Sequence, residues 1–177
     1  MILFNITDIG HFMRKLLSEG ETAFDQFLLS EASVTAGNTF TIDGHINKNF
    51  YSAEEVEILT ETAEAHGHIY SPLMSRWETL KGYCFQLIKG KKTPLAFRFV
   101  FYLAPENIER FLGSIDTTLT LHDIDGLSLN IKYDEHTLSC TTATSLHLFT
   151  LDKSVDHAWD QMVKKFLQKQ EIRFEEL

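Results

Sequence analysis

Two histidines separated by one glycine, His66 and His68, form the most metal-like pattern in the sequence. Neutral imidazole suits zinc, copper or nickel, and Glu61, Glu64 or His45 could supply a third ligand. A structural zinc site needs four ligands, commonly with cysteine among them, and neither cysteine lies near this stretch. The pattern therefore favours a solvated loop, with a metal site as the alternative, and we expect no cofactor.

The serines and cysteines lack the surroundings of a catalytic nucleophile. Ser30 and Ser139 are outside any Gly-x-Ser-x-Gly elbow. Cys84 and Cys140 fall on predicted apolar faces, where a thiol is usually buried and unreactive. We find no catalytic signature and expect the protein not to be an enzyme.

Carboxylates lie beside glycines in Asp43-Gly44-His45 and in Asp123-Ile-Asp125-Gly126. Paired carboxylates could perform acid–base chemistry if one of them were desolvated. Asp-Gly steps are also typical of turns, and the turn is the favoured interpretation.

Lysines gather in the segment Lys89-Gly-Lys-Lys-Thr-Pro94. The segment lacks the Gly-Lys-Ser/Thr step of a Walker motif, so it does not predict a nucleotide loop. As a basic turn it could contact an acidic partner or a phosphate backbone, or it could simply be solvated. The candidate binding residues are this turn and three cations elsewhere: Lys89, Lys91, Lys92, Arg14, Lys15 and Arg110.

A row of hydroxyl side chains occupies a predicted strand near the C-terminal end of the sequence. Its members are Ser139, Thr141, Thr142, Thr144 and Ser145. Threonine favours strands whatever its role, so an exposed face is the simpler interpretation and a ligand surface the alternative.

Length, charge and apolar content exclude several classes of protein. The 177 residues suit one domain, and the formal net charge of −9 argues against general coating of nucleic acid or of anionic membranes. The first residues lack a signal-peptide pattern, and no stretch approaches the ~20 apolar residues of a membrane span. We expect a cytoplasmic protein without membrane contact.

Periodicity of the apolar residues predicts alternating helices and strands. Helices are expected at residues 8–18, 52–65, 105–112 and 152–170, and a further helix is expected to open at a capping box, Ser75–Glu78, and to end at Gly90. The helix at 52–65 also opens with a capping box, Ser52–Glu55. A strand from Tyr83 is the alternative to the helix that opens at Ser75–Glu78. Strands are expected at residues 2–6, 24–34, 39–46, 97–103, 117–122, 127–133 and 137–149, and the charged tail 171–177 is expected to fray. The pattern indicates an α+β fold, mainly an antiparallel sheet with helices packed on it.

Two segments of the single domain, residues 1–50 and 95–150, share the order strand, helix, strand, turn, strand. The second has an additional strand, so the pair would form two β-α-β-β(-β) repeats, separated by a helical insertion at 51–90 and followed by the helix at 152–170. One such unit cannot bury both its helix and its sheet face alone. Chance alternation of helices and hairpins is the other interpretation.

Three segments carry a resemblance to a known family: Asn38-Thr-Phe-Thr-Ile-Asp-Gly-His-Ile-Asn47, Leu87-Ile-Lys-Gly-Lys-Lys-Thr-Pro-Leu95 and Leu138-Ser-Cys-Thr-Thr-Ala-Thr-Ser145, with Asp152-Lys-Ser further on. Through them the chain resembles an uncharacterised bacterial protein family, a domain of unknown function, over nearly its whole length. The resemblance implies no activity.

A second resemblance concerns the arrangement of elements in DNA sliding clamps. Phe101-Tyr-Leu-Ala-Pro-Glu-Asn-Ile-Glu-Arg-Phe-Leu112 is followed by Thr118-Leu-Thr-Leu and Asp125-Gly-Leu-Ser-Leu129, which is similar to a clamp repeat. The basic set Arg14, Lys15 and Arg110 is thin for such a protein, and residues 50–90 have no clamp counterpart.

The favoured function is a non-catalytic binding or scaffold module that contacts a protein or a second copy of itself. A clamp-like factor that contacts nucleic acid is the first alternative. A metal-dependent enzyme that uses the loop of His66 and His68 is the second.

Overall fold

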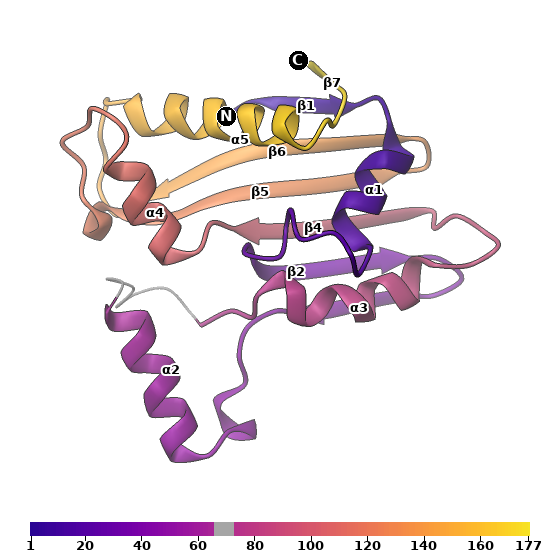
Figure 1. Cartoon of the computed structure of the whole chain (residues 1–177), viewed down its shortest axis with the longest axis horizontal. Helices are drawn as coiled ribbons and strands as arrows, with labels where there is room; N and C mark the ends of the chain where they lie inside the picture. Colours follow the sequence, from indigo (N-terminus) through magenta and orange to yellow (C-terminus); the bar gives the residue numbers. More distant parts are fainter. Residues whose placement is uncertain (66–72) are drawn as a thin grey trace.

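A seven-stranded sheet in the order β3-β2-β4-β5-β6-β1-β7 forms the centre of the molecule (Figure 1). The structure, a computed structural model, describes residues 1–65 and 73–177. All neighbouring strands are antiparallel. The strands are β1 (Leu3–Ile6), β2 (Leu28–Thr35), β3 (Thr39–Asp43), β4 (Ala96–Tyr102), β5 (Ile124–Asp134), β6 (Thr137–Leu146) and β7 (Phe174–Glu176).

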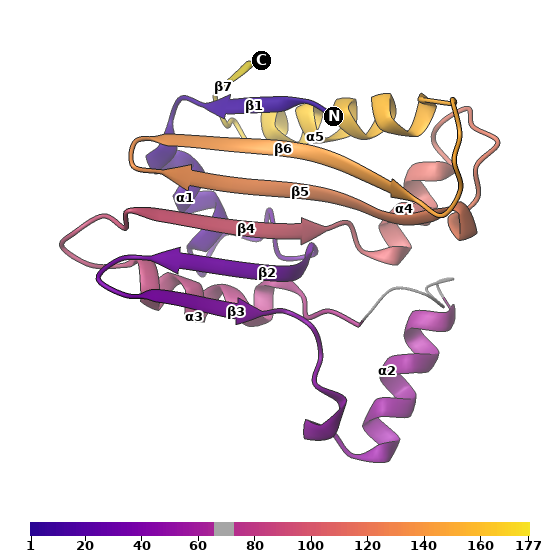
Figure 2. The ribbon, with the colours of Figure 1, turned by 180° about the vertical axis from the view of Figure 1, so that it is seen from behind.

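Helices cover only one face of this sheet (Figures 1 and 2). Those on the covered face are α1 (Ile9–Leu17), α3 (Trp77–Ile88), α4 (Pro105–Leu112) and α5 (Ser154–Lys169). Two short 3-10 turns, η1 (Lys48–Phe50) and η2 (Leu121–Asp123), and the helix α2 (Ala53–Ala65) complete the described elements. Figure 2 shows the opposite face without a helix over it.

Strict alternation in β4 explains why one face is covered and the other is open. Phe97, Phe99 and Phe101 point to the covered face and are buried, whereas Arg98 between them is exposed. Side chains of successive strand residues point to opposite faces, so this pattern gives one apolar face and one wetter face. The same alternation continues in β5 and β6.

Two buried tryptophans connect the helices to the rest of the fold. The indole Nε1 of Trp77 in α3 donates to the carbonyl oxygen of Leu16 at 2.8 Å. That of Trp159 in α5 donates to the carbonyl oxygen of Ser128 at 3.0 Å. Each ring therefore buries a large apolar surface while its one polar group remains satisfied.

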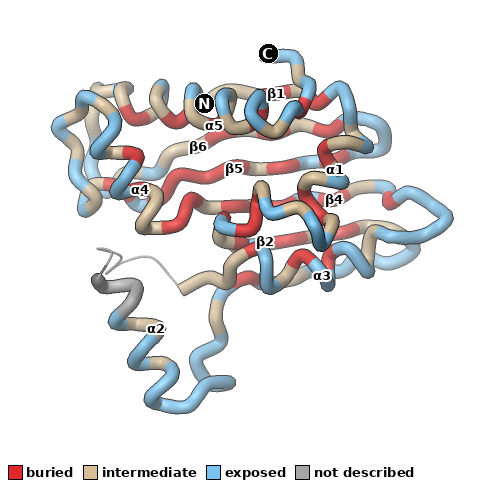
Figure 3. Tube along the Cα trace, in the orientation of Figure 1, coloured by how far each residue is buried: buried red, intermediate tan, exposed pale blue. Residues whose placement is uncertain are grey.

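The helix α2 stands apart from the layer of helices and sheet (Figure 1). Colouring by burial shows much of the sheet and the inner sides of the other helices as buried, while the segment that leads into α2 and most of the described part of that helix, residues 53–61, are exposed (Figure 3). The capping box predicted at its start is confirmed, because Ser52 N donates to Glu55 Oε2 at 2.8 Å and Glu55 N donates to Ser52 Oγ at 3.3 Å.

The α+β class and the antiparallel sheet are confirmed, but the predicted strand at 117–122 is wrong. Side chains bond to the backbone there instead: Thr117 Oγ1 accepts from Leu119 N at 3.2 Å, and Asp123 Oδ2 accepts from Thr120 N at 2.7 Å. Such local bonds compete with pairing in a sheet.

The repeat is not confirmed by the strand order. β4 pairs with β5 in the second segment, whereas β1 pairs with β6 and β7, not with β2, in the first. The clamp-like arrangement, which depends on the repeat, is not supported either.

Other local features also differ from the prediction. Residues 24–27 form turns before β2, and the capping box at Ser75–Glu78 is wrong because Ser75 N donates to the Gly44 carbonyl at 2.8 Å and the helix begins at Trp77. The alternative strand from Tyr83 is wrong as well. The tail, expected to fray, forms β7 against β1.

Candidate binding pocket between α1 and α3

An apolar cavity of about 270 Å³ opens between α1 and the C-terminal end of α3, above the adjoining ends of β4 and β5. α1 and α3 contribute half of its twelve lining residues. The lining residues are Ile9, Met13, Arg14, Leu17, Ser18, Phe85, Ile88, Lys89, Thr93, Pro94, Phe97 and Tyr133. Binding pockets for small molecules are typically apolar cavities with a few polar groups, which is the character of this one.

Two stacked rings form the base of the pocket. The Phe97 and Tyr133 rings lie 4.9 Å apart, centroid to centroid, with an interplanar angle of 16°. Both residues are buried, and the Tyr133 hydroxyl donates to the Glu135 carbonyl oxygen. The polar end of Tyr133 is therefore satisfied, and its ring is held as an apolar surface.

Arg14 lies at the edge of the pocket and is held there through His11. The carbonyl oxygen of Gln170 can only accept, so His11 Nε2 donates to it at 3.1 Å. In the neutral ring, Nδ1 then accepts from Arg14 Nη2 at 3.0 Å. The last turn of α1 thus places an exposed guanidinium beside the apolar wall.

Lys89 provides the second positive charge at the edge of the pocket. It follows α3 directly, and its Nζ lies 5.8 Å from the centroid of the Phe85 ring, one helical turn earlier. An ammonium group over an aromatic face is attracted by the ring quadrupole. Lys89 and Arg14 thereby make a local cationic edge in a chain of net charge −9.

Of the four remaining predicted binding residues, two lie in the turn beside the pocket and two do not. Lys91 and Lys92 are exposed in the turn that leads from α3 to β4. Lys15 bonds instead to Glu21, Nζ to Oε2, at 2.8 Å, and this hydrogen bond holds the pKa of Glu21 below its usual value. Arg110 lies on α4, at the other end of the molecule from α1 (Figure 1).

The polar groups of the pocket lining are few. They are the two cations and the hydroxyls of Ser18, Thr93 and Tyr133. The described lining residues include no carboxylate, imidazole or thiol. The arrangement suits an apolar group with a negative charge at one end.

A second depression, of about 370 Å³, lies at the β5–β6 turn. Its lining is polar and charged: Lys132, Asp134, Glu135, Thr137 and Ser139. Lys132 Nζ and Asp134 Oδ2 lie 3.3 Å apart, both well exposed, so these two charges offset each other. This depression has neither the apolar wall nor the net charge of the first pocket.

A serine, an aspartate and a histidine meet at the end of the β5–β6 pair, but in the wrong order for a hydrolase. Ser145 Oγ donates to Asp125 Oδ2 at 2.9 Å, and His147 Nε2 lies 3.8 Å from Asp125 Oδ1. A catalytic triad needs the imidazole between the hydroxyl and the carboxylate. Here the carboxylate lies in the middle, so the serine is not activated.

The other Asp-Gly segment also forms local bonds. Asp43 Oδ1 accepts from His45 N at 3.0 Å and lies 2.5 Å from His45 Nδ1. These bonds hold the pKa of Asp43 below its usual value, the backbone bond contributing most. Among the side chains of residues 1–61 and 73–177, no group of three or more His, Cys, Asp or Glu could hold a metal ion. His66 and His68 lie outside the described residues, and the metal site remains a prediction.

The hydroxyl row of β6 divides between the two faces of the sheet. Thr142 is buried on the covered face, where its Oγ1 donates to Asp160 Oδ1, and Thr144 Oγ1 donates to Asp156 Oδ1. Ser139 and Thr141 belong to the opposite face. Thr142 and Thr144 thus attach α5 to the sheet and form no common ligand surface with the others.

Both thiols are buried, as predicted. Burial raises the pKa of the Cys84 thiol to about 12 and raises that of Cys140 further. A thiol that stays protonated at neutral pH is a poor nucleophile and a poor metal ligand.

Sequence reasoning missed a buried ion pair, Lys81 with Asp25. Lys81 Nζ lies 2.7 Å from Asp25 Oδ1 and donates to the Glu21 carbonyl oxygen at the same distance. A usable signal was present: Lys81 falls four residues after Trp77 and three before Cys84, within the apolar stripe of α3. A charge at such a position indicates a buried partner.

Comparison with known proteins identifies the family of the chain. Residues 15–175 match the model of a family described as "Family of unknown function (DUF5721)". The chain belongs to this family. The resemblance to a domain of unknown function is therefore confirmed, and the family description assigns no activity. No curated protein and no solved structure matches the chain. Within the described residues, no helix has the length and apolar character to cross a membrane.

Proposed function

We propose that the protein is a non-catalytic binding module whose pocket between α1 and α3 accepts an apolar group with a carboxylate or similar anion beside it. The observation that carries the proposal is the juxtaposition of an apolar cavity of about 270 Å³ with Arg14 and Lys89 at its edge. The apolar wall supplies binding energy through buried area, and the two cations select for negative charge.

The size of the pocket limits what it can hold. At a liquid share of about 30 Å³ per water, the cavity corresponds to roughly nine waters, or a group of roughly ten to twelve non-hydrogen atoms. That is one aromatic side chain or a short aryl or alkyl carboxylate. A group of this size in a half-open pocket is expected to bind with a Kd of about 1 mM.

Two probes of equal length test the proposal on the full chain: 4-phenylbutyrate, which is an anion, and 4-phenylbutan-1-ol, which is neutral. We expect 4-phenylbutyrate to saturate and to shift the ¹H–¹⁵N resonances of α1, of the end of α3 and of the turn that follows. The alcohol should bind several-fold more weakly, because it lacks the charge that Arg14 and Lys89 recognise.

Two charge variants provide the matched comparison. Lys89→Ala should weaken phenylbutyrate about two- to fivefold, the range of one exposed charge pair. Arg110→Ala removes a cation of α4, far from the pocket, and should leave binding unchanged. Equal binding of the two probes, or equal effects of the two substitutions, would contradict the proposal.

A cytoplasmic location is part of this proposal, and the two buried thiols are compatible with a reducing compartment. A clamp-like contact with nucleic acid has less support, because Arg110 does not share the face formed by Arg14 and the lysine turn.

A further inference from the structure

The segment of residues 48–61, which we call the arm, is exposed almost throughout. It comprises η1, the link to α2 and the first nine residues of that helix. Only Val56, Leu59 and Thr60 are half-buried, and none of its side chains is buried. Phe50 is 83% exposed, which is unusual for a large apolar side chain.

Isolated helices shorter than about 12–15 residues are marginal in water, because packing of an apolar face supplies most helical stability in proteins. α2 has 13 residues, and the Ser52–Glu55 capping box supports only its first turn. Because no side chain of residues 48–61 is buried, packing of the arm against another surface would stabilise it.

The arm carries both features that the pocket is proposed to recognise. Phe50 and Tyr51 pack edge to face, with their centroids 5.3 Å apart, and present an aromatic cluster. Four carboxylates follow this cluster: Glu54, Glu55, Glu57 and Glu61. The arm has one ammonium group, that of Lys48 at its start. An aromatic group beside a block of negative charge is the complement of an apolar pocket beside Arg14 and the lysine turn.

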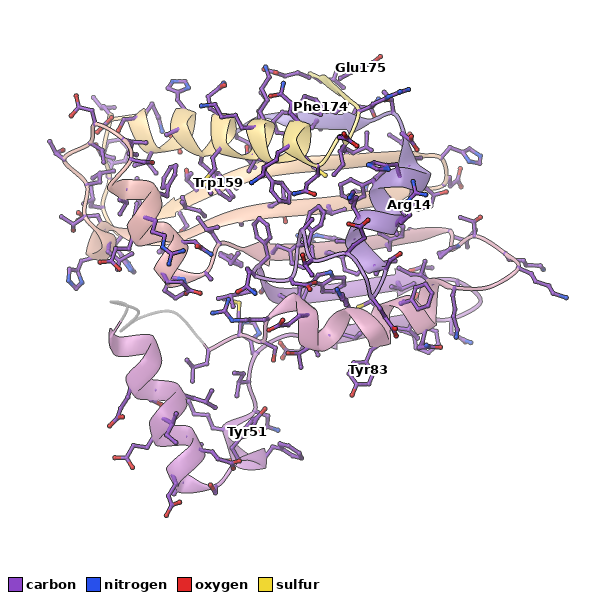
Figure 4. All side chains as sticks on the ribbon, in the orientation of Figure 1. Arg14, Tyr51, Tyr83, Trp159, Phe174 and Glu175 are labelled. Carbon is purple, nitrogen blue, oxygen red and sulfur yellow. The ribbon has the colours of Figure 1, made fainter. Side chains whose placement is uncertain are left out.

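The arm and the pocket cannot meet within one molecule. The two opposite views place α2 at one end of the long axis and the turn after α3 at the other (Figures 1 and 2). Figure 4 shows the same separation at the level of side chains, with Tyr51 on the arm and Arg14 on α1 far from it. The complementary surfaces of one chain are thus available only to another molecule.

We propose that the occupant of the pocket is the arm of a second copy of this chain, and that the two copies exchange arms about a two-fold axis. Each arm inserts an aromatic side chain, Phe50 or Tyr51, between α1 and α3 of the other copy. Its carboxylates then face Lys89, Lys91 and Lys92. A reciprocal contact of this kind closes on itself and yields a dimer, not a filament. The inference rests on the proposed function, because it names the partner of the same pocket.

Charge reversal with mixing tests this arrangement on the full chain. Variant A carries Glu54→Lys, Glu57→Lys and Glu61→Lys in the arm, which leaves the Ser52–Glu55 capping box intact. Variant B carries Lys89→Glu, Lys91→Glu and Lys92→Glu in the turn. All six positions are exposed, so both variants should fold, which far-ultraviolet circular dichroism verifies.

Analytical ultracentrifugation over a range of concentrations gives the readout. The unaltered chain is expected to dimerise, and A alone and B alone should dimerise at least tenfold more weakly, because arm and turn then carry like charge. An equimolar mixture of A and B should recover dimerisation, since each arm meets a turn of opposite charge. A chain that carries all six changes should also recover it. Phe50→Ala with Tyr51→Ala should weaken the dimer at any salt concentration.

Three results would overturn the inference: a monomer at all concentrations, a dimer that neither A nor B weakens, or no recovery on mixing. Binding of 4-phenylbutyrate to variant A separates this failure from a failure of the proposed function. Variant A keeps Arg14 and Lys89, so its pocket should still bind the probe. If variant A binds the probe while the unaltered chain is monomeric at all concentrations, the proposed binding pocket is supported and its natural occupant is a different molecule.

Discussion

Replacement of Lys81 by methionine is expected to destabilise the protein far more than loss of an ordinary ion pair. The side chains of Lys81 and Asp25 are only 9% and 11% exposed, and Nζ contacts both the Asp25 carboxylate and a backbone carbonyl at 2.7 Å. Methionine fills a similar volume but leaves the carboxylate buried without its cation. Breaking a buried pair from one side typically costs about 3–5 kcal/mol.

The expected loss is large enough to measure in two ways. A change of about 3–5 kcal/mol in the free energy of unfolding corresponds to a melting temperature about 6–20 °C lower for a chain of this size. Urea unfolding followed by tryptophan fluorescence measures the free energy directly, because Trp77 lies one helical turn from Lys81. Lys81→Met with Asp25→Leu removes both charges, and only the bond to the Glu21 carbonyl remains uncompensated. That double variant should lose about 1 kcal/mol.

The pair Lys15–Glu21 is the matched control. Its Nζ–Oε2 distance is 2.8 Å, close to that of the buried pair, but its side chains are 20% and 31% exposed. Lys15→Met should therefore destabilise the protein by a small fraction of the effect at Lys81, since water screens the charges. If the two substitutions have equal effects, or if the double variant is as unstable as Lys81→Met, burial is not the cause.

Three further predictions concern separate parts of the fold. Gly44→Ala should prevent stable folding or shift β3, because an added Cβ would lie 1.9 Å from a backbone carbonyl oxygen of β2; thermal melting of the soluble fraction checks this. Cys84 and Cys140 should not react with a thiol reagent until the protein unfolds, since burial keeps both protonated, and a titration with and without denaturant shows the difference. Asp123 accepts hydrogen bonds from the backbone N and the hydroxyl of Thr120, which lowers the pKa of its carboxyl group. The carboxylate therefore stabilises the fold above its unfolded pKa, and this contribution should disappear as the pH falls below about 4. In urea titrations at several pH values, the free energy of unfolding of Asp123→Asn should fall less steeply with acid than that of the unaltered chain.

The elements that could be predicted are those in which one periodicity dominates. β4 alternates phenylalanine with smaller or polar residues, and α5 has an unbroken apolar stripe, so both were placed within two residues of their ends. β7 was missed because Phe174 is its one apolar residue, and only the pairing with β1 makes this charged segment a strand. The same limit applies to Phe24 and Phe27, whose apolar character reflects burial in turns and not in a strand.

The pocket was predictable only as unrelated parts. Arg14 and Lys89 were identified as candidate cations, but their proximity depends on how α1 packs beside α3, which no local pattern specifies. The sequence pattern predicts that Met13 and Ile9 are buried in the core, because they continue the apolar stripe of α1. They are half-buried and line the pocket instead, since the stripe is wider than the surface that α3 covers.

The position of β1 in the sheet has a consequence for synthesis. It precedes the other strands of this sheet along the chain, yet both its neighbours, β6 and β7, come from the last third of the 177 residues. At a translation rate of about 5–20 residues per second, β6 is complete only about 7–30 s after β1. Phe4 and Ile6, buried in the finished fold, stay without their β6 neighbours for that whole interval. The nascent chain is therefore exposed to aggregation through β1, and this side of the sheet cannot close until β6 has been translated.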